Sequence, residues 1–392
     1  MVFGWDIHDK VYDNVTVSNA ENGFKDVLAK IDISTLRRQP WNNNIPFFTF
    51  DFFADAQTPL AVCPRNLLKK VISQLETEGL MPFSAVEFEF YNYSGLLFLF
   101  PFSFFFFFFF SFSSPFPPPI ETPYTLEDKN FTALSNLTPG MFGYSLLRPS
   151  MYKDFFNELY DMSRRYDIPL EAIHTETGPG VYEVAIEYAE SLKSADRAAL
   201  FKTTAKEIGM RHKIMPSFMA KPNASLPGCS GHVHYSLWDL EGKKNLFWDS
   251  SDPKQMSQLM KHFIAGQLHC LPYITPMLVP NVNSYKRLVE GAWAPVVLSW
   301  GVENRTSTIR VINPNEKGIR VETRLGGADI NPYLAMAASL AAGLYGIKHK
   351  LALQPESAGD NISDKNVSGI IYRTCFHPTC LILSRCLGDI SM

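Results

Sequence analysis

The sequence predicts an α+β protein built around a largely antiparallel sheet. Segments with apolar residues at helical spacing are interspersed with short segments of strict apolar–polar alternation, which is typical of half-buried strands. The two kinds follow each other without a regular strand–helix–strand rhythm, and the chain has no Walker A or GxGxxG loop. A doubly wound parallel sheet is therefore not expected. A length of 392 residues suffices for two or three domains.

Residues 1–57 predict a small strand-rich unit. The alternating pieces "VFGWDI", "VYDNVTV" and "PFFTFDFF" are separated by Asn, Asp, Gly and Pro. Residues 63–79 have apolar positions at helical spacing and end in Gly79, so a helix is expected there. Residues 84–91 ("SAVEFEFY") alternate strictly and predict a strand.

Three further helices are expected in the rest of the chain. The first begins at Pro149 and Ser150, and the last is opened by Pro332 and is rich in Ala and Leu. The predicted helices span 149–167, 195–212 and 330–351, and the predicted strands span 181–188, 232–238, 306–312 and 319–325.

Charge and cysteine content argue against several classes of protein. With 36 basic and 39 acidic residues the net charge is −3, which offers no electrostatic reason to expect nucleic acid or a membrane surface as partner. No signal peptide is visible, so we expect a cytoplasmic location. The six cysteines form no CxxC pair, and free thiols are a simpler expectation than a metal site at Cys375, Cys380 and Cys386.

Residues 96–119 contain only Leu, Phe, Ser and Pro. The apolar run is almost long enough for a membrane span, but it leaves directly from the strand that carries Glu87 and Glu89. A disordered tract with so much Phe would aggregate. These four amino acids are those encoded by all-pyrimidine codons, and a pyrimidine tract precedes many 3′ splice sites. We therefore predict that residues 95–120 are a retained intron or a gene-model error.

Carboxylates and imidazoles recur on the predicted strands. Glu87 and Glu89 share one strand face, because side chains alternate between faces. Each of these carboxylates and imidazoles has an ordinary explanation by itself: a solvated strand face, a surface ion pair or a hydrogen-bonded core histidine. Together they suit Mg²⁺ or Mn²⁺, and two such ions beside arginines are what phosphoryl transfer requires. The other members of the set are Glu176, Glu183, His232, His234, Arg320, Glu322 and Arg324.

The chain resembles the glutamine synthetase family over nearly its whole length outside residues 95–120. Seven motifs occur in the family's order: "EFEFY", "HTETGPGVYEVAI", "SFMAKP", "GHVHYSLW", "NSYKRLVEGAWAP", "WGVENRTSTIRV" and "RVETRLGGADINPYLAMAASLAAGLYGI". Within the family it is most similar to the branch of lengsin and γ-glutamyl ligase-like proteins.

The resemblance implies two domains and a ring-shaped assembly. Residues 1–57 would be part of an N-terminal β-grasp domain that lacks its first strands. Residues 58–392 would be a catalytic domain with a curved antiparallel sheet flanked by helices, interrupted at 95–120 and off-pattern from about residue 367. Family members assemble into stacked rings in which neighbouring subunits share each active site.

The resemblance also assigns roles to individual residues. Two Mg²⁺ or Mn²⁺ sites are implied, one held by Glu89, Glu176 and Glu183 and the other by Glu87, His232 and Glu322. The implied catalytic arginines, which contact glutamate and phosphoryl groups, are Arg287, Arg305 and Arg324, and the implied nucleotide-binding residues are His234, Arg310, Lys317 and Arg320.

The implied reaction activates the γ-carboxylate of glutamate with ATP, and ammonia or another amine then displaces phosphate. Trp293 stands where the family has a flap glutamate that helps to deprotonate ammonium. Indole offers no base but a large apolar face, so we expect an organic amine to be preferred, unless Trp293 merely packs under a loop. The alternative to a ligase is an inactive, lengsin-like structural protein, which the altered ends of the chain would favour.

Overall fold

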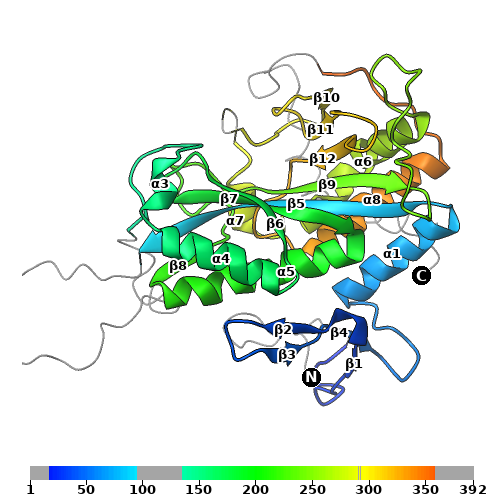
Figure 1. Cartoon of the computed structure of the whole chain (residues 1–392). Helices are drawn as coiled ribbons and strands as arrows, with labels where there is room; N and C mark the ends of the chain where they lie inside the picture. The colour runs from blue at the N-terminus through cyan, green and yellow to red at the C-terminus, as the bar shows by residue number, and fades with distance from the viewer. Residues whose placement is uncertain (1–16, 95–134, 290, 292, 358–392) are drawn as a thin grey trace, which may run out of the picture.

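The computed structural model describes residues 17–94, 135–289, 291 and 293–357 (Figure 1). The predicted segment "VFGWDI", the Phe-rich stretch 95–120, the tail from residue 367 and the three C-terminal cysteines lie outside these ranges. Cys63, Cys229 and Cys270 are buried and form no disulfide within the described ranges.

An eight-stranded sheet forms the centre of the molecule, with the long strand β5 (Met81–Ser94) in its middle. On one side β5 pairs with β7 (Val181–Glu190), which pairs with β6 (Leu170–Thr175). On the other side it pairs with β9 (Gly231–Trp238) and, near its end, with β8 (Ile214–Ser217). The sheet continues from β9 through β12 (Arg320–Thr323) and β11 (Ile309–Ile312) to β10 (Trp300–Val302). Among the described strand pairs of this sheet only β10–β11 is parallel, so the prediction of a largely antiparallel sheet is confirmed.

Helices cover one face of this sheet, as Figure 1 shows. They are α1 (Pro64–Thr77), α4 (Lys153–Arg165), α5 (Ser191–Arg211) and α8 (Pro332–Lys348), and all four were expected. The apolar side of β5 faces them: Phe88 and Phe90 are fully buried and pack on Phe201 of α5 and on Phe218. The opposite face of β5 is left for Glu87 and Glu89.

The sequence interpretation missed one long helix. Helix α6 (Gln258–Leu278) contains Pro272 and Pro276, which normally break a helix because proline lacks an amide hydrogen. It packs closely against α8, and twelve of its residues are buried, so tertiary burial outweighs the two prolines. The expected helix 149–167 is also divided, with the short α3 (Leu147–Ser150) preceding α4. Within the described ranges, no helix is both long and apolar enough to cross a membrane.

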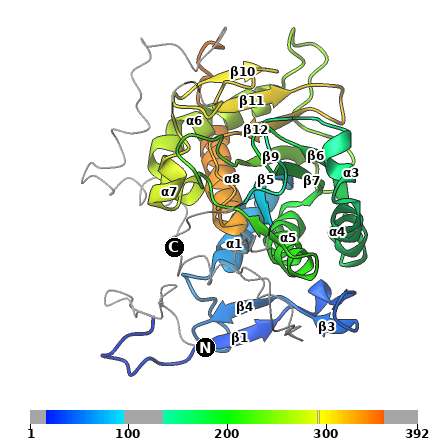
Figure 2. The same ribbon diagram turned by 90° about the vertical axis from the view of Figure 1, so that its left-hand side faces the viewer.

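The N-terminal residues form two small sheets that lie beneath α1 and α5 in both views (Figures 1 and 2). Strand β1 (Leu28–Ile31) pairs with β4 (Phe50–Phe53), and β2 (Arg37–Gln39) pairs with β3 (Ile45–Phe47). The buried Arg65 of α1 joins this unit to the main body through ion pairs with Asp51 and with Asp196 of α5. A strand-rich unit is confirmed for the described residues; its assignment as a β-grasp domain stays a prediction.

Candidate functional site

Strand register brings the predicted carboxylates and imidazoles together on the open face of the sheet. On β5, Glu87 lies opposite His232 of β9, and Glu89 lies opposite Glu183 of β7. On the neighbouring strand pair, Glu322 of β12 lies opposite His234. Since opposed residues in an antiparallel pair point to the same side, these side chains share one face.

The first cluster consists of Glu89, Glu176 and Glu183, whose nearest carboxylate oxygens all lie within 4.8 Å of one another. Burial, and then the neighbouring Glu183 charge, raises the pKa of Glu89 to about 7. One hydrogen bond, from the Ser230 amide at 2.6 Å, holds the Glu89 carboxylate in place. Three carboxylates this close repel each other unless a cation lies between them. This set is the one that the resemblance assigns to the first metal.

The second cluster lies beside the first. Ligand atoms of Glu87, His234 and Glu322 also lie within 4.8 Å of one another. His232 adjoins them, with its Nδ1 4.0 Å from Glu322 Oε1. The buried Glu322 carboxylate accepts hydrogen bonds from Arg310 and Arg324.

The two histidines differ in what their ring nitrogens do. Arg320 Nε donates to His234 Nδ1 at 3.3 Å, so the ring hydrogen of His234 sits on Nε2. That Nε2 lies 3.1 Å from Glu87 Oε1. In contrast, His232 Nδ1 is buried and has no hydrogen-bond partner in the described part of the chain. Burial, followed by Arg324 and Arg287, holds the pKa of His232 well below its usual range. A neutral imidazole with a free nitrogen is what a metal ligand requires.

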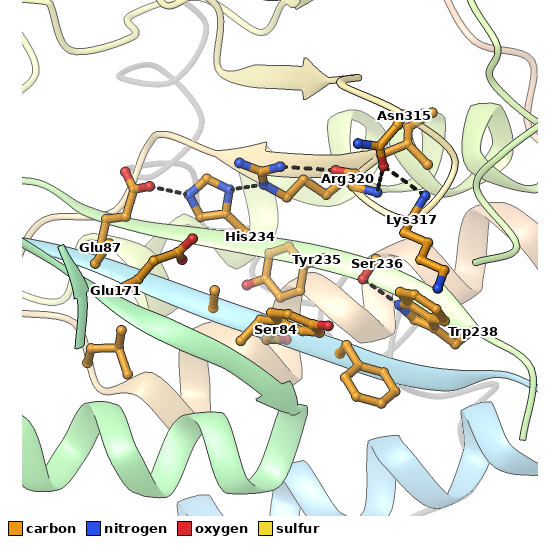
Figure 3. Close-up of a pocket in the computed structure, with 17 residues that line it drawn as sticks. Ser84, Glu87, Glu171, His234, Tyr235, Ser236, Trp238, Asn315, Lys317 and Arg320 are labelled. Carbon is orange, nitrogen blue, oxygen red and sulfur yellow. Dashed lines mark hydrogen bonds and ion pairs between the residues drawn. The ribbon is translucent and has the colours of Figure 1, made fainter. Parts of the chain in front are cut away.

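A cavity of about 320 Å³ opens on the Glu87 side of the clusters (Figure 3). Its polar wall carries Glu87, His234 and Arg320 in a connected row, with Lys317 beyond them. Its far end is aromatic, where Phe83 lies 5.6 Å from Trp238 between ring centroids. Three of the four predicted nucleotide-binding residues therefore line one cavity with an aromatic end.

A second cavity, of about 650 Å³, opens on the Glu89 side. All three predicted catalytic arginines line it, together with Glu89, Glu176 and His232. Arg287 is buried, and its guanidinium donates to the carbonyl oxygens of Leu325 and Arg324. Trp293 lines this cavity with 64% of its surface exposed, so no loop of the described ranges covers it.

Arg310 is the one predicted nucleotide-binding residue that lines neither cavity. It lies behind Glu322, directly opposite it on the β11–β12 pair. Its guanidinium donates hydrogen bonds to Glu322 and to Glu303.

Two residues that line the second cavity, and His174 beside it, were not predicted. His174 of β6 lies opposite Glu183, and its Nε2 is 3.2 Å from a Glu183 oxygen. Tyr144 stacks on the His174 ring with a centroid distance of 4.8 Å, and Lys221 lines the cavity wall. The two-residue spacing of His174 in β6 and Glu176 just beyond its end was the only local signal for His174.

The sheet carries two clusters of three potential metal ligands on one face, and each cluster lies beside a cavity lined by arginine or lysine side chains. Such a site is typical of enzymes that transfer a phosphoryl group with divalent ions. Comparison with known proteins narrows this class. A family model described as "Glutamine synthetase, catalytic domain" matches residues 61–369. The chain therefore belongs to the glutamine synthetase family.

Individual relatives agree with this assignment. The chain is 45% identical over 373 residues to a type-1 glutamine synthetase 2 of Dictyostelium discoideum, covering 95% of this chain and 66% of that protein. It is 35% identical to a glutamate–isopropylamine ligase of Pseudomonas sp, covering 90% of this chain and 71% of the relative. Among solved structures, a GmaS/ADP complex aligns with a TM-score of 0.69 and 28% identity over 86% of this chain and 70% of that chain. The chain thus spans about two thirds of the length of these curated relatives.

Proposed function

We propose that the protein is an ATP-dependent ligase that forms a γ-glutamyl amide from glutamate and ammonia or another amine, through a γ-glutamyl phosphate. The observation that carries this proposal is the placement of two three-ligand clusters between an aromatic-ended cavity and an arginine-lined one. ATP would occupy the first cavity and glutamate the second, so that the γ-phosphate and the γ-carboxylate meet over the clusters.

The donor set fits two divalent cations such as Mg²⁺ or Mn²⁺. Glu89, Glu176 and Glu183 would hold one. The other would be held by Glu87 and Glu322 of the second cluster and by the adjoining His232, whose Nδ1 has no hydrogen-bond partner among the described residues, in place of His234, whose Nδ1 accepts from Arg320. When bound, such ions neutralise charge on the phosphate oxygens during transfer. The relatives' names support the proposal: a glutamine synthetase joins glutamate to ammonia, and an isopropylamine ligase joins it to an organic amine.

In the first step a γ-carboxylate oxygen of glutamate attacks the γ-phosphorus of ATP. The bond from that phosphorus to the bridging oxygen breaks, and ADP leaves. Arg287 and Arg324 approach this point from the buried wall, and Arg305 from the exposed side. Their charges stabilise the negative oxygens of the transferred group.

In the second step the amine nitrogen attacks the acyl carbon. The carbon–oxygen bond to phosphate breaks, and the nitrogen gives up a proton. Glu176 lines the cavity where the amine would enter and is a candidate to attract the ammonium form. Trp293 covers the same mouth with an apolar face, which excludes water and favours an organic substituent.

Phosphate release tests the proposal. We expect the chain, with and without residues 95–120, to release phosphate from ATP only when glutamate, Mn²⁺ and an amine are all present, and Glu89→Gln to abolish the release. The matched control Glu241→Gln changes an exposed carboxylate that pairs only with Lys243 among the described residues. If no amine supports release, calorimetry with Mn²⁺ decides the alternative: a folded chain without ion or nucleotide binding would be the inactive, lengsin-like protein.

Three further expectations belong to this proposal. They are the division into domains at residue 57, a ring-shaped assembly with shared active sites, and a cytoplasmic location. Analytical ultracentrifugation tests the assembly directly, since a ring sediments far ahead of a 44.3 kDa monomer.

A further inference from the structure

Glu303 is an exposed carboxylate with an unusual backbone. It directly follows β10 and has φ = 53°, in the left-handed region that non-glycine residues rarely adopt. Its amide donates to the Val311 carbonyl oxygen, which extends the pairing of β10 with β11 by one residue. A strained residue persists only where its surroundings hold it, and such residues concentrate at functional sites.

The Glu303 side chain is held at both oxygens. Oε2 accepts from Arg310 Nη2 at 2.5 Å, and Oε1 accepts from the Asn313 amide at 3.3 Å. Arg310 in turn donates from Nη1 to Glu322 Oε2 at 3.1 Å. The Arg310 guanidinium is therefore hydrogen-bonded on two sides. One partner is the buried Glu322 of the second cluster, and the other is the exposed Glu303 outside it.

Glu322 by itself cannot orient Arg310. It shares its charge with Arg324, which binds the other carboxylate oxygen. The Arg310 side chain has several rotatable bonds, and one hydrogen bond leaves it free to rotate about the contact. A second, charge-assisted bond from the opposite side fixes the plane of the guanidinium.

We propose that Glu303 is a positioning residue: it holds the Arg310 guanidinium against Glu322 and thereby fixes the Glu322 carboxylate at the second cluster, beside the cavity proposed for the nucleotide. The inference rests on the proposed function, because it takes Glu322 as a ligand of the metal ion beside the nucleotide. Glu303 does not touch substrate; it acts through Arg310.

Two substitutions separate this role from folding. Glu303→Gly removes the side chain and suits the positive φ, so the fold is retained. Glu303→Gln keeps the size and one acceptor oxygen but loses the charge. The matched control is Glu78→Gln, which removes one charge of an exposed ion pair with Lys348, remote from both cavities.

Calorimetry on the full chain with a non-hydrolysable ATP analogue and Mg²⁺ gives the first readout. We expect binding to weaken about tenfold in Glu303→Gly, less in Glu303→Gln, and not in Glu78→Gln. In the phosphate-release assay, KM for ATP should rise by a similar factor, while KM for glutamate changes less than about twofold.

These measurements distinguish failure of the positioning role from failure of the proposed ligase function. Failure of the native chain to bind the nucleotide would overturn the proposed function itself. Native binding with unchanged or tighter binding in Glu303→Gly would overturn only the positioning role. An equal rise in both KM values would also contradict it, because a general loosening of the site would then explain the effect.

Discussion

Trp293 is the residue at the second cavity that, from the sequence resemblance, we expect to replace a flap glutamate of the family. It stands exposed at the rim, with φ = 57°, and shares the cavity with Glu89 and Glu176. An indole face attracts an organic ammonium through cation–π contact worth roughly 0.5–2 kcal/mol, but it cannot take up a proton. The indole is therefore expected to influence which amine the protein uses as substrate.

We expect the native chain to prefer a small organic amine over ammonia, and Trp293→Glu to shift kcat/KM towards ammonia by about tenfold or more. The measurement is amide formation with ammonia, ethylamine and isopropylamine at equal concentrations. Trp293→Phe, which keeps an aromatic face, serves as the control and should retain the preference. Efficient glutamine formation by the native chain would show that Trp293 does not select the amine.

Lys202 is a buried lysine behind the site, on the helix-covered face of the sheet. Its amine donates to the Ile330 carbonyl oxygen at 2.7 Å and lies 4.7 Å from the centre of the Phe88 ring. Burial lowers its pKa to about 7; the Lys206 charge acts in the same direction, and the Asp329 charge opposes it. The folded chain therefore releases this proton about three pH units before the unfolded chain does.

Because the unfolded state binds the extra proton between pH 7 and about 10, stability should rise with pH in that window. We expect the free energy of unfolding of the native chain to gain about 2 kcal/mol more between pH 7 and pH 9 than that of Lys202→Met. Urea unfolding at the two pH values measures this. Lys153→Met, at an exposed position on α4, should behave like the native chain; equal gains in all three proteins would contradict the assignment.

At the scale of elements, the pairing of α6 with α8 depends on glycines at the contact. A Cβ on Gly266 would lie 2.2 Å from the Ala342 carbonyl oxygen, and one on Gly346 would lie 2.1 Å from the His262 carbonyl oxygen. Both obstacles are backbone atoms, so relief requires the helices to separate. Their close approach also explains how α6 tolerates two prolines.

We expect Gly266→Ala and Gly346→Ala each to destabilise the protein by about 3 kcal/mol or more. Gly143→Ala is the control, since its Cβ would meet the nearest atom, Thr177 Oγ1, at an ordinary 3.6 Å. Thermal unfolding measures the difference. A melting temperature of either helix variant close to that of the control would show that α6 and α8 have room to adjust.

At the scale of the whole molecule, the strand that carries Glu87 and Glu89 meets the chain again just beyond residues 95–134. The Ser94 amide donates to the Ser135 carbonyl oxygen at 2.8 Å, and Tyr93 is bridged to Asn136. The two ends of the intervening segment are therefore neighbours, and residues 121–134 would still link them if residues 95–120 were removed. The described fold closes without the Phe-rich stretch.

We therefore expect a chain lacking residues 95–120 to fold with unchanged β5 pairing and a free energy of unfolding within about 1 kcal/mol of the native value. Urea unfolding and circular dichroism measure this. Sequencing of the cDNA across the junction tests its origin: a spliced message without these codons agrees with a retained intron, and a uniform full-length message contradicts it. Failure of the shortened chain to fold would show that the stretch is structural.

Sequence periodicity by itself determined the elements whose pattern is local. The helix opened by Pro332 and the alternation that places Glu87 and Glu89 opposite Phe88 depend on residues a few positions apart. The order of the motifs was enough to predict the family. Helix α6 could not be predicted in this way, because its two prolines disfavour a helix. Its burial against α8 outweighs their effect.

Tertiary structure alone decided how the strands align, and with them the site. Register places Glu89 opposite Glu183 and gives His232 and His234 different neighbours, although both lie on the same face of one strand. It also brings Arg310 between Glu303 and Glu322. Side-chain alternation along a strand shows which residues share a face, but hydrogen bonds between strands distant in sequence determine which of them meet.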